Sequence, residues 1–245
     1  MFRSKNLIFR QLQESTSSTF TYILGCAKSK EAIIIDPVDL TAPRDANLIK
    51  ELDLDLKYSI NTHCHADHIT GTNALKNDKF FPKSKSMISE KAGAKADILL
   101  KHDQEINFGD FSLTAKNTFG HTNGCMSFID FNHKVCFTGD ALMIRKCGRT
   151  DFQQGSPKDL YQNVHKHLFT LDDDFLVFPG HDYAGIMFSS IGEERKYNLR
   201  LTKSEEEFVK IMDNLNLAYP KKIVESLPMN LADGDEQFVV EAKIE

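Results

Sequence analysis

Thr62-His63-Cys64-His65-Ala66-Asp67-His68 brings three imidazoles and one carboxylate together within seven residues. Neutral imidazole is the commonest protein ligand for a transition metal, and a nearby carboxylate adds a charged oxygen donor. A hydrophobic core rarely needs three polar rings at one turn, so packing does not explain this cluster. A coincidental polar turn is the alternative, but the density of the motif favours a metal site.

The sequence on either side of this motif predicts a turn between a strand and a helix. Residues 58–61, just before it, are typical of the end of a buried strand, and residues 69–75, just after it, are typical of the start of a helix. A turn of this kind is held by a rigid scaffold and presents its side chains into a cleft. We therefore expect this turn to border a functional site.

Three further apolar runs end in the same kinds of residue. Taken singly, a glycine followed by His or Asp is usually only a turn. Several such strand ends along one chain can converge on one edge of a sheet sandwich, so together with the first motif they predict one shared site. The three segments are Gly120-His121-Thr122 after Phe111–Phe119, Thr138-Gly139-Asp140 after Lys134–Phe137, and Pro179-Gly180-His181-Asp182 after Phe175–Phe178.

Together these motifs resemble those of the metallo-β-lactamase superfamily, and more narrowly those of its persulfide dioxygenase (sulfur dioxygenase) branch. The similarity extends from about Phe9 to about Pro228. The run Cys147–Gly155 distinguishes this branch from its hydrolytic relatives. The resemblance implies an αββα sandwich of the α/β (α+β) class, in which two mixed β-sheets pack face to face and helices cover the outside.

The same resemblance implies one Fe(II) per chain, held by His63, His121 and Asp140. Two histidines and one carboxylate on one face of the iron leave three coordination positions open, as O₂ chemistry requires. The other motif residues would then orient the ligands and fix imidazole tautomers by hydrogen bonding; they are His65, Asp67, His68 and His181. No catalytic residue beyond the metal centre is implied.

The activity that the resemblance implies is oxidation of glutathione persulfide by O₂ and water to sulfite and glutathione, a step of sulfide catabolism. Glutathione carries two carboxylates, and arginine binds carboxylates bidentately. Arg149 lies inside the branch-specific run and Tyr183 lies two residues after His181, so we expect both to contact the substrate. An ion pair with Asp151 is the alternative role for Arg149.

All seven potential ligands are present, so a dinuclear site with two Zn or mixed Fe/Zn ions is the alternative. Such a site is that of hydroxyacylglutathione hydrolase (glyoxalase II), which attacks a thioester with a bridging hydroxide. The run from Cys147 and the short segment after His181 favour the dioxygenase, and the complete ligand set disfavours an inactive scaffold protein. In the dinuclear assignment one ion binds His63, His65 and His121, the other binds Asp67, His68 and His181, and Asp140 bridges them.

Composition and charge exclude several classes of function. The net charge of −5 gives no sign of nucleic-acid or membrane binding, and no apolar run approaches the roughly 20 residues that span a bilayer. The cysteines are odd in number and scattered, so we expect no disulfides and a reducing compartment. Met1–Asn6 is too short to establish a targeting segment. We expect a cytoplasmic protein, or a mitochondrial matrix protein if the source is eukaryotic, and the resemblance implies a homodimer.

Smaller expectations concern single residues near the motifs. Cys64 should point away from the metal, because His63 and His65 point towards it, and Cys147 should be a packed, small apolar residue. Alanine in place of Gly180 should not alter the ligand. The tail beyond Leu227 carries no motif and should be weakly ordered or peripheral.

The pattern predicts one metallo-β-lactamase-like domain over residues 1–245, with a catalytic core at about 9–190 and a short helical extension at about 191–245. Ser156 should cap a helix that begins at Pro157, and Thr202–Glu205 matches a capping box. The expected strands are 19–25, 32–36, 56–61, 86–88, 105–108, 111–117, 126–131, 134–137 and 175–178, and the expected helices are 44–52, 67–75, 90–96, 157–169 and 202–215.

Overall fold

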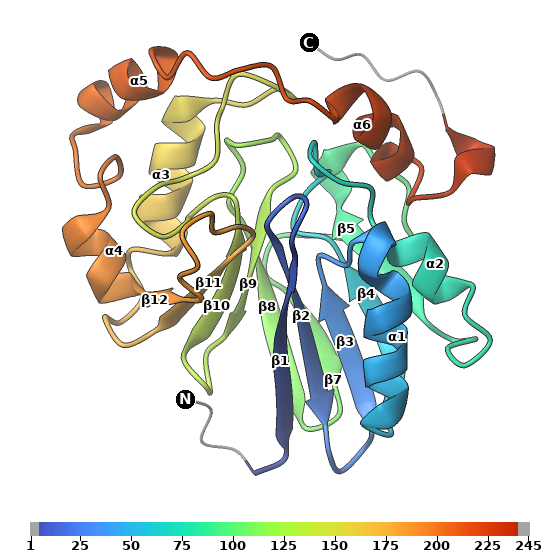
Figure 1. The fold of residues 1–245 in the computed structure, drawn as a ribbon. Helices are drawn as coiled ribbons and strands as arrows, with labels where there is room; N and C mark the ends of the chain where they lie inside the picture. Colours follow the sequence, from blue (N-terminus) through green and yellow to red (C-terminus); the bar gives the residue numbers. More distant parts are fainter. Residues whose placement is uncertain (1–4, 240–245) are drawn as a thin grey trace.

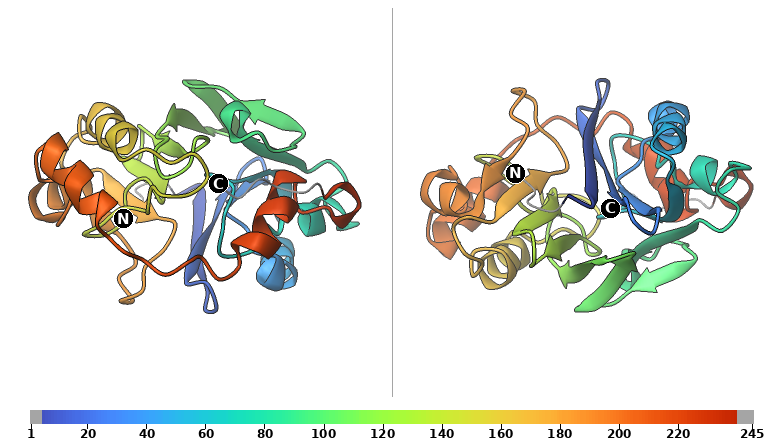
Figure 2. Two further views of the ribbon diagram at one scale, coloured as in Figure 1. Left: turned by 90° about the horizontal axis from the view of Figure 1, so that it is seen from above. Right: turned by 90° about the horizontal axis from the view of Figure 1, so that it is seen from below.

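Two six-stranded sheets pack face to face between layers of helices in the computed structural model, which describes residues 5–239 (Figures 1 and 2). The strand order is β1-β2-β3-β4-β5-β6 in the first sheet and β12-β11-β10-β9-β8-β7 in the second. Each sheet contains both antiparallel and parallel pairs, so both sheets are mixed. The predicted αββα sandwich is confirmed. Residues 1–4 of the segment considered for targeting lie outside the described residues.

The strands and helices have the following bounds. The first sheet contains β1 (Leu7–Glu14), β2 (Thr19–Cys26), β3 (Glu31–Ile35), β4 (Asp55–Ile60), β5 (Lys85–Ser89) and β6 (Ile98–Leu100). The second contains β7 (Gln104–Phe108), β8 (Phe111–Asn117), β9 (Met126–Asp130), β10 (Val135–Gly139), β11 (Leu176–Pro179) and β12 (Ser189–Ser190). The helices are α1 (Ala42–Glu51), α2 (Thr72–Lys76), α3 (Pro157–His167), α4 (Ile191–Tyr197), α5 (Glu205–Asp213) and α6 (Ile223–Leu231). Among residues 5–239, none of these helices has the length and apolar character needed to span a bilayer.

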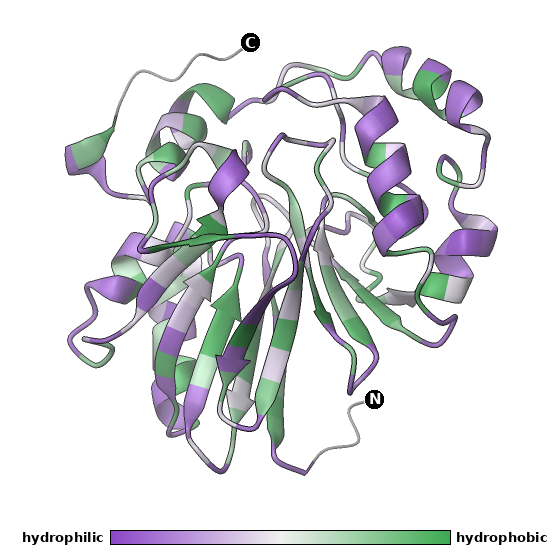
Figure 3. Cartoon of the chain, turned by 180° about the vertical axis from the view of Figure 1, so that it is seen from behind, coloured by the Kyte–Doolittle hydropathy of each residue, from purple (hydrophilic) through white to green (hydrophobic). Residues whose placement is uncertain are grey.

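The central strands are apolar on both faces because each sheet is covered on both sides. In β2, Tyr22 and Leu24 point into the layer between the sheets, whereas Ile23 points outward into the cluster formed with α1. Phe137 of β10 and Phe178 of β11 meet Tyr22 from the second sheet, with ring centroids 5.0 and 5.7 Å from the Tyr22 ring. Apolar residues accordingly follow the strands, while the exposed sides of the helices are polar (Figure 3).

Helices cover the two outer faces and reach them through apolar side chains. The clusters place α1 and α2 on the first sheet and α3 and α5 on the second (Figure 1). The start of α3 follows the prediction, since Ser156 Oγ accepts from the Asp159 N–H and Pro157 occupies the first helical position. The next capping box lies two residues later than predicted, because Ser204 and Glu207 form it and α5 begins at Glu205.

Several element predictions were wrong, each because tertiary contacts or short length outweighed local pattern. The helix predicted at 67–75 begins only at Thr72, as α2, because the residues before Thr72 form an irregular loop. The helix predicted at 90–96 is a single 3-10 turn, and Gly93 ends it in the left-handed region. The elements β1, β6, β12, α4 and α6 were not predicted from the sequence. The tail beyond Leu227 is not peripheral where it is described, because α6 continues to Leu231 and buries Asn230; residues 240–245 lie outside the described residues.

Tyr22→Phe should lower the free energy of unfolding by about 1–2 kcal/mol, because the buried Tyr22 hydroxyl donates to the Pro179 carbonyl at 2.6 Å. Tyr161→Phe is a matched control, since the Tyr161 hydroxyl also donates to a backbone carbonyl, that of Lys203 at 2.9 Å, but in an exposed position. Urea denaturation measures both variants. Equal losses in the two variants would contradict the role of Tyr22 in joining the sheets.

Candidate metal centre

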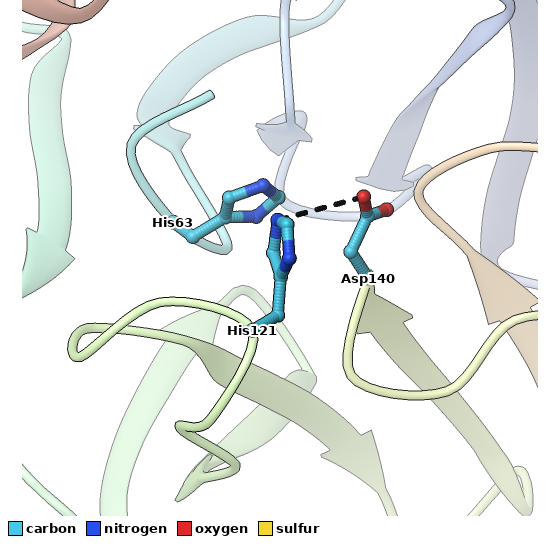
Figure 4. A group of neighbouring side chains, drawn as sticks. All are labelled: His63, His121 and Asp140. Atoms are coloured by element: carbon cyan, nitrogen blue, oxygen red, sulfur yellow. Dashed lines mark ion pairs between the residues drawn. The ribbon is translucent and has the colours of Figure 1, made fainter. Parts of the chain in front are cut away.

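His63, His121 and Asp140 converge at one edge of the sandwich (Figure 4). His63 follows β4 of the first sheet, whereas His121 lies between β8 and β9 and Asp140 follows β10, both in the second sheet. One donor atom from each side chain lies within 4.8 Å of the others. Asp140 Oδ2, for example, lies 3.7 Å from His121 Nε2. Two imidazoles and one carboxylate in this arrangement can hold a single transition-metal ion.

Hydrogen bonds fix the tautomer of both histidines. The Arg149 carbonyl oxygen can only accept, so His121 Nδ1, at 2.6 Å, must donate to it. Thr62 Oγ1 donates its one proton to Asp36 Oδ2 at 2.8 Å, so it accepts from His63 Nδ1 at 2.9 Å. The lone pair of each imidazole is therefore on Nε2, as a metal ligand requires. Burial, with His65 and His121 nearby, holds the pKa of His63 well below its usual range, which keeps this ring neutral.

Asp36 organises the start of the metal loop, which comprises residues 61–71. Its backbone is left-handed, with φ of 50°, and its buried carboxylate accepts from the Thr62 N–H at 2.7 Å and the Thr62 hydroxyl at 2.8 Å. The same carboxylate lies 3.0 Å from His65 Nε2. Burial lowers the pKa of His65, but the charge of Asp36 and this hydrogen bond outweigh it and raise the pKa. Asp36 is a site residue that was not singled out from the sequence, although a polar residue after the apolar run of β3 repeats the signal of the other strand ends.

His181 links two carboxylates. Its Nδ1 lies 2.7 Å from Asp140 Oδ1 and its Nε2 lies 2.8 Å from Asp67 Oδ2. Burial lowers the pKa of His181, but the charges of Asp140 and Asp67 outweigh it and raise the pKa well above its usual range. Charge from His181 in turn holds the pKa of both carboxyls low, against the effect of burial. An imidazolium that donates from both nitrogens has no lone pair for a metal, so His181 orients Asp140 here.

His65, Asp67 and His68 form a second group whose donor atoms lie within 4.8 Å of one another. His65 Nδ1 and His68 Nε2 are buried, and neither has a hydrogen-bond partner among the described residues. Burial, with His65 nearby, lowers the pKa of His68, so its ring is neutral. The structure therefore brings all seven predicted residues to one edge. It groups His65 with Asp67 and His68, whereas the dinuclear alternative groups it with His63 and His121.

Two glycines let the backbone approach the centre. A Cβ at Gly148 would lie 2.7 Å from His121 Nδ1, so glycine allows the branch-specific run to pack against this imidazole. A Cβ at Gly180 would lie 2.7 Å from Asp140 Oδ1. The expectation that alanine at position 180 leaves the ligand undisturbed was therefore wrong. A methyl group there would require Asp140 or the backbone at position 180 to shift.

The two predicted substrate residues lie near the centre in different environments. Arg149 binds Asp151 bidentately, at 2.6 and 2.7 Å, and donates to the Ala218 carbonyl at 2.7 Å. The alternative ion pair is therefore present. Tyr183 is 64% exposed, and its ring lies parallel to the His181 ring with centroids 6.0 Å apart. Lys146, which the sequence analysis did not consider, places its ammonium 5.1 Å from the centre of the Tyr183 ring.

The cysteines play packing roles. All five are buried and free, so the prediction of no disulfides is confirmed. Cys64 points into an apolar cluster with Ile88 and Leu227, and Cys147 packs beside Met212 of α5. Burial raises the pKa of each of these two thiols to about 12, so both are protonated near neutral pH. Protonated, buried thiols are poor nucleophiles, as the packing roles predicted for Cys64 and Cys147 require.

Comparisons with known proteins agree with this geometry. Residues 16–181 match the model of the metallo-β-lactamase superfamily. The mitochondrial persulfide dioxygenase ETHE1 of Homo sapiens is 53% identical over 93% of this chain and 89% of the relative. The crystal structure of ETHE1 from Myxococcus xanthus has a TM-score of 0.89 and 43% identity, and the match covers 93% of this chain and 100% of that one. Hydroxyacylglutathione hydrolase GloC of Haemophilus influenzae is 32% identical over 69% of this chain and 86% of the relative.

The fold and the cluster of His and Asp side chains define a metallo-β-lactamase-type metal enzyme. At this identity and coverage, the chain belongs to the persulfide dioxygenase branch of the metallo-β-lactamase superfamily.

The His181 imidazolium should make the stability of the metal-free protein depend on pH. The folded state keeps a proton that the unfolded chain loses near the usual histidine pKa of 6.5. This stabilisation is therefore complete below that pH and is lost as the pH rises through the raised pKa of the folded state. The unfolding free energy of the wild type minus that of His181→Gln should thus shrink as the pH rises above about 7, measured by urea denaturation with a chelator present. A constant difference over this range would mean that the ring is neutral.

Proposed function

We propose that this chain is an iron-dependent persulfide dioxygenase that converts glutathione persulfide, O₂ and water to glutathione, sulfite and two protons. The observation that supports this most is the division of roles among the seven residues. His63, His121 and Asp140 each keep one donor atom free towards a common point, while His181 is committed to two carboxylates. That arrangement suits one metal ion with open positions rather than a pair of ions sharing all seven ligands.

We further propose that the resident ion is Fe(II), with His63, His121 and Asp140 as its ligands. When bound there, a ferrous ion would supply redox chemistry with O₂ and leave positions open to the substrate. The protein's own contribution is to present Nε2 of both histidines unprotonated and to hold Asp140 as a charged carboxylate. His65, Asp67, His68 and His181 surround these ligands, and His181 keeps Asp140 oriented by donating from Nδ1 to Oδ1.

Substrate recognition is proposed at the side of the centre that Arg149 and Tyr183 border. The Arg149 carbonyl fixes the His121 ring, so the backbone of Arg149 lies next to the metal centre. Lys146 places its ammonium beside the exposed Tyr183 ring. Arg149 and Lys146 each offer a cation that can bind a carboxylate, and glutathione carries two carboxylates.

The remaining proposals concern the whole chain. We propose that residues 1–245 act as one catalytic domain, with a core at about 9–190 and a helical extension after it, and that two chains form a homodimer. The Homo sapiens relative is named as mitochondrial, which supports a mitochondrial matrix location if the source is eukaryotic and a cytoplasmic one otherwise. Neither a nucleic acid nor a membrane is proposed as a partner.

Hydroxyacylglutathione hydrolase activity is the second candidate function. Two observations favour it: the identity to the GloC relative, and the buried, unpartnered nitrogens His65 Nδ1 and His68 Nε2, which could hold a second ion with Asp67. Against it, the similarity to the persulfide dioxygenase is higher and covers more of the chain.

Metal content and O₂ uptake on one anaerobically purified sample distinguish the two functions. We expect about one iron per chain, O₂ consumption only when glutathione persulfide is added, and release of sulfite. Two metal ions per chain, no O₂ uptake and cleavage of S-lactoylglutathione would instead establish the hydrolase.

Single substitutions should separate the proposed ligands from the residues around them. His63→Ala, His121→Ala and Asp140→Ala should each lose stoichiometric iron, because each removes a donor atom. His68→Ala should keep one iron per chain with an affinity reduced by about 10–100-fold. Iron analysis and chelator competition measure this, and His165→Ala on α3 serves as a control away from the centre. Equal losses in His68→Ala and His63→Ala would contradict the assignment.

Arg149→Ala should raise KM for glutathione persulfide by about tenfold, the loss of one charge-assisted carboxylate contact. Asp151→Asn is the matched variant, because it removes the partner of the ion pair and leaves the guanidinium in place. If Arg149 binds substrate, Asp151→Asn should keep KM near the wild-type value. If the two variants raise KM equally, Arg149 acts only through its ion pair. Steady-state O₂ uptake measures both.

A further inference from the structure

Asn230 of α6 lies behind the metal loop and touches neither group of donor atoms directly. Its side chain is buried, and its position falls in the segment without any recognised motif. Three hydrogen bonds of 2.8 Å join it to the loop: Oδ1 accepts from the Thr70 N–H, and Nδ2 donates to the carbonyls of His65 and His68.

The chemistry of these partners fixes the orientation of the amide. Two carbonyl oxygens can only accept and one N–H can only donate, so Nδ2 must face His65 and His68 and Oδ1 must face Thr70. Both protons of the amide nitrogen are used, and both carbonyls belong to residues of the buried donor cluster. Among uncharged side chains, only an amide has two protons on one atom, the nitrogen, and an acceptor on another, the oxygen.

The metal loop needs such a partner because it is irregular. Backbone carbonyls outside helices and strands must find other donors when they are buried. The loop also carries Asp67, which fixes His181 at 2.8 Å, and His181 fixes Asp140 at 2.7 Å. A shift of the loop between His65 and His68 would therefore reach a proposed metal ligand through two short hydrogen bonds.

We propose that Asn230 is a positioning residue for the metal centre. It holds the loop backbone at His65 and His68, which places Asp67 against His181 and thereby Asp140 towards the metal. The helix that carries Asn230, α6, thus supports the metal loop and is not a peripheral tail. This inference rests on the metal centre proposed above and is independent of the identity of the persulfide.

Other contacts keep α6 in place, so changing Asn230 tests positioning rather than docking. Ile223 and Leu227 pack against Cys64 and Ile88, and the Lys95 N–H donates to the Leu231 carbonyl at 2.9 Å. After the helix, Asp233 accepts from Lys76 Nζ at 2.8 Å and from Ser86 Oγ at 2.6 Å. None of the bonds recorded for Asp233 reaches the metal loop, so Asp233 offers a control that loosens the same segment.

The test uses the full chain with Asn230→Ala and Asn230→Asp, and with Asp233→Ala as the control. Aspartate has the size of asparagine but turns the donor towards the two carbonyls into an acceptor, so it should disturb the loop without leaving a cavity. We expect the dissociation constants for Fe(II), and for Co(II) as a spectroscopic probe, to rise by about tenfold in both Asn230 variants under anaerobic chelator competition. The visible absorption bands of bound Co(II) should shift as well.

The control separates positioning from stability. Asp233→Ala should lower the thermal unfolding midpoint of the metal-free protein yet leave both the dissociation constants and the Co(II) spectrum unchanged within about twofold. Asn230→Ser is a smaller change that keeps one donor, for use if the alanine or aspartate variant does not fold. Its dissociation constants should lie between those of the wild type and those expected for alanine. Asn230 variants that lower only the midpoint, with wild-type metal affinity and spectrum, would overturn the proposal. A wild-type protein that binds neither metal would instead overturn the proposed metal centre.

Discussion

The packing of the two sheets against each other is the constraint on which the site depends. His63 comes from the first sheet, whereas His121, Asp140 and His181 come from the second, so their separation is set by the apolar layer between the sheets. Tyr22 contributes to this layer twice, because its ring meets Phe137 and Phe178 and its hydroxyl binds the Pro179 carbonyl. Proline 179 is followed directly by Gly180 and His181, so one buried hydrogen bond ties β2 of the first sheet to the strand end that carries a site residue.

Alternation of carboxylates and imidazoles allows so many polar groups to be buried at one edge. Three carboxylates of the site have a histidine as a partner: Asp36 faces His65, and Asp67 and Asp140 share His181. Opposite charges offset the cost of removing these groups from water, and the hydrogen bonds fix which atoms remain free. In the first group of donors, Nε2 of His63, Nε2 of His121 and one oxygen of Asp140 lie close together and can share one ion.

A persulfide dioxygenase and a hydroxyacylglutathione hydrolase are both similar to this chain. Here the backbone of the run Cys147–Gly155 reaches the centre directly, since Gly148 permits close approach to His121 and the Arg149 carbonyl fixes its tautomer. These contacts come from the main chain. This run can therefore act on the candidate metal site without contributing a ligand.

Much of the site was readable from sequence because strand ends carry a local signal. A polar residue after a short apolar run, often beside glycine, marked His63, His121, Asp140 and His181, and the resemblance that these motifs carry implied the sandwich of two sheets. The sequence by itself therefore determined the class of fold and which side chains meet. Only the tertiary structure decided that His181 lies between two carboxylates, that Arg149 is paired with Asp151, and that Asn230 from α6 holds the metal loop. The physical reason is that these contacts join residues far apart in the chain or depend on side-chain orientation. Sequence periodicity encodes the face that a residue takes, but not the partner that it finds there.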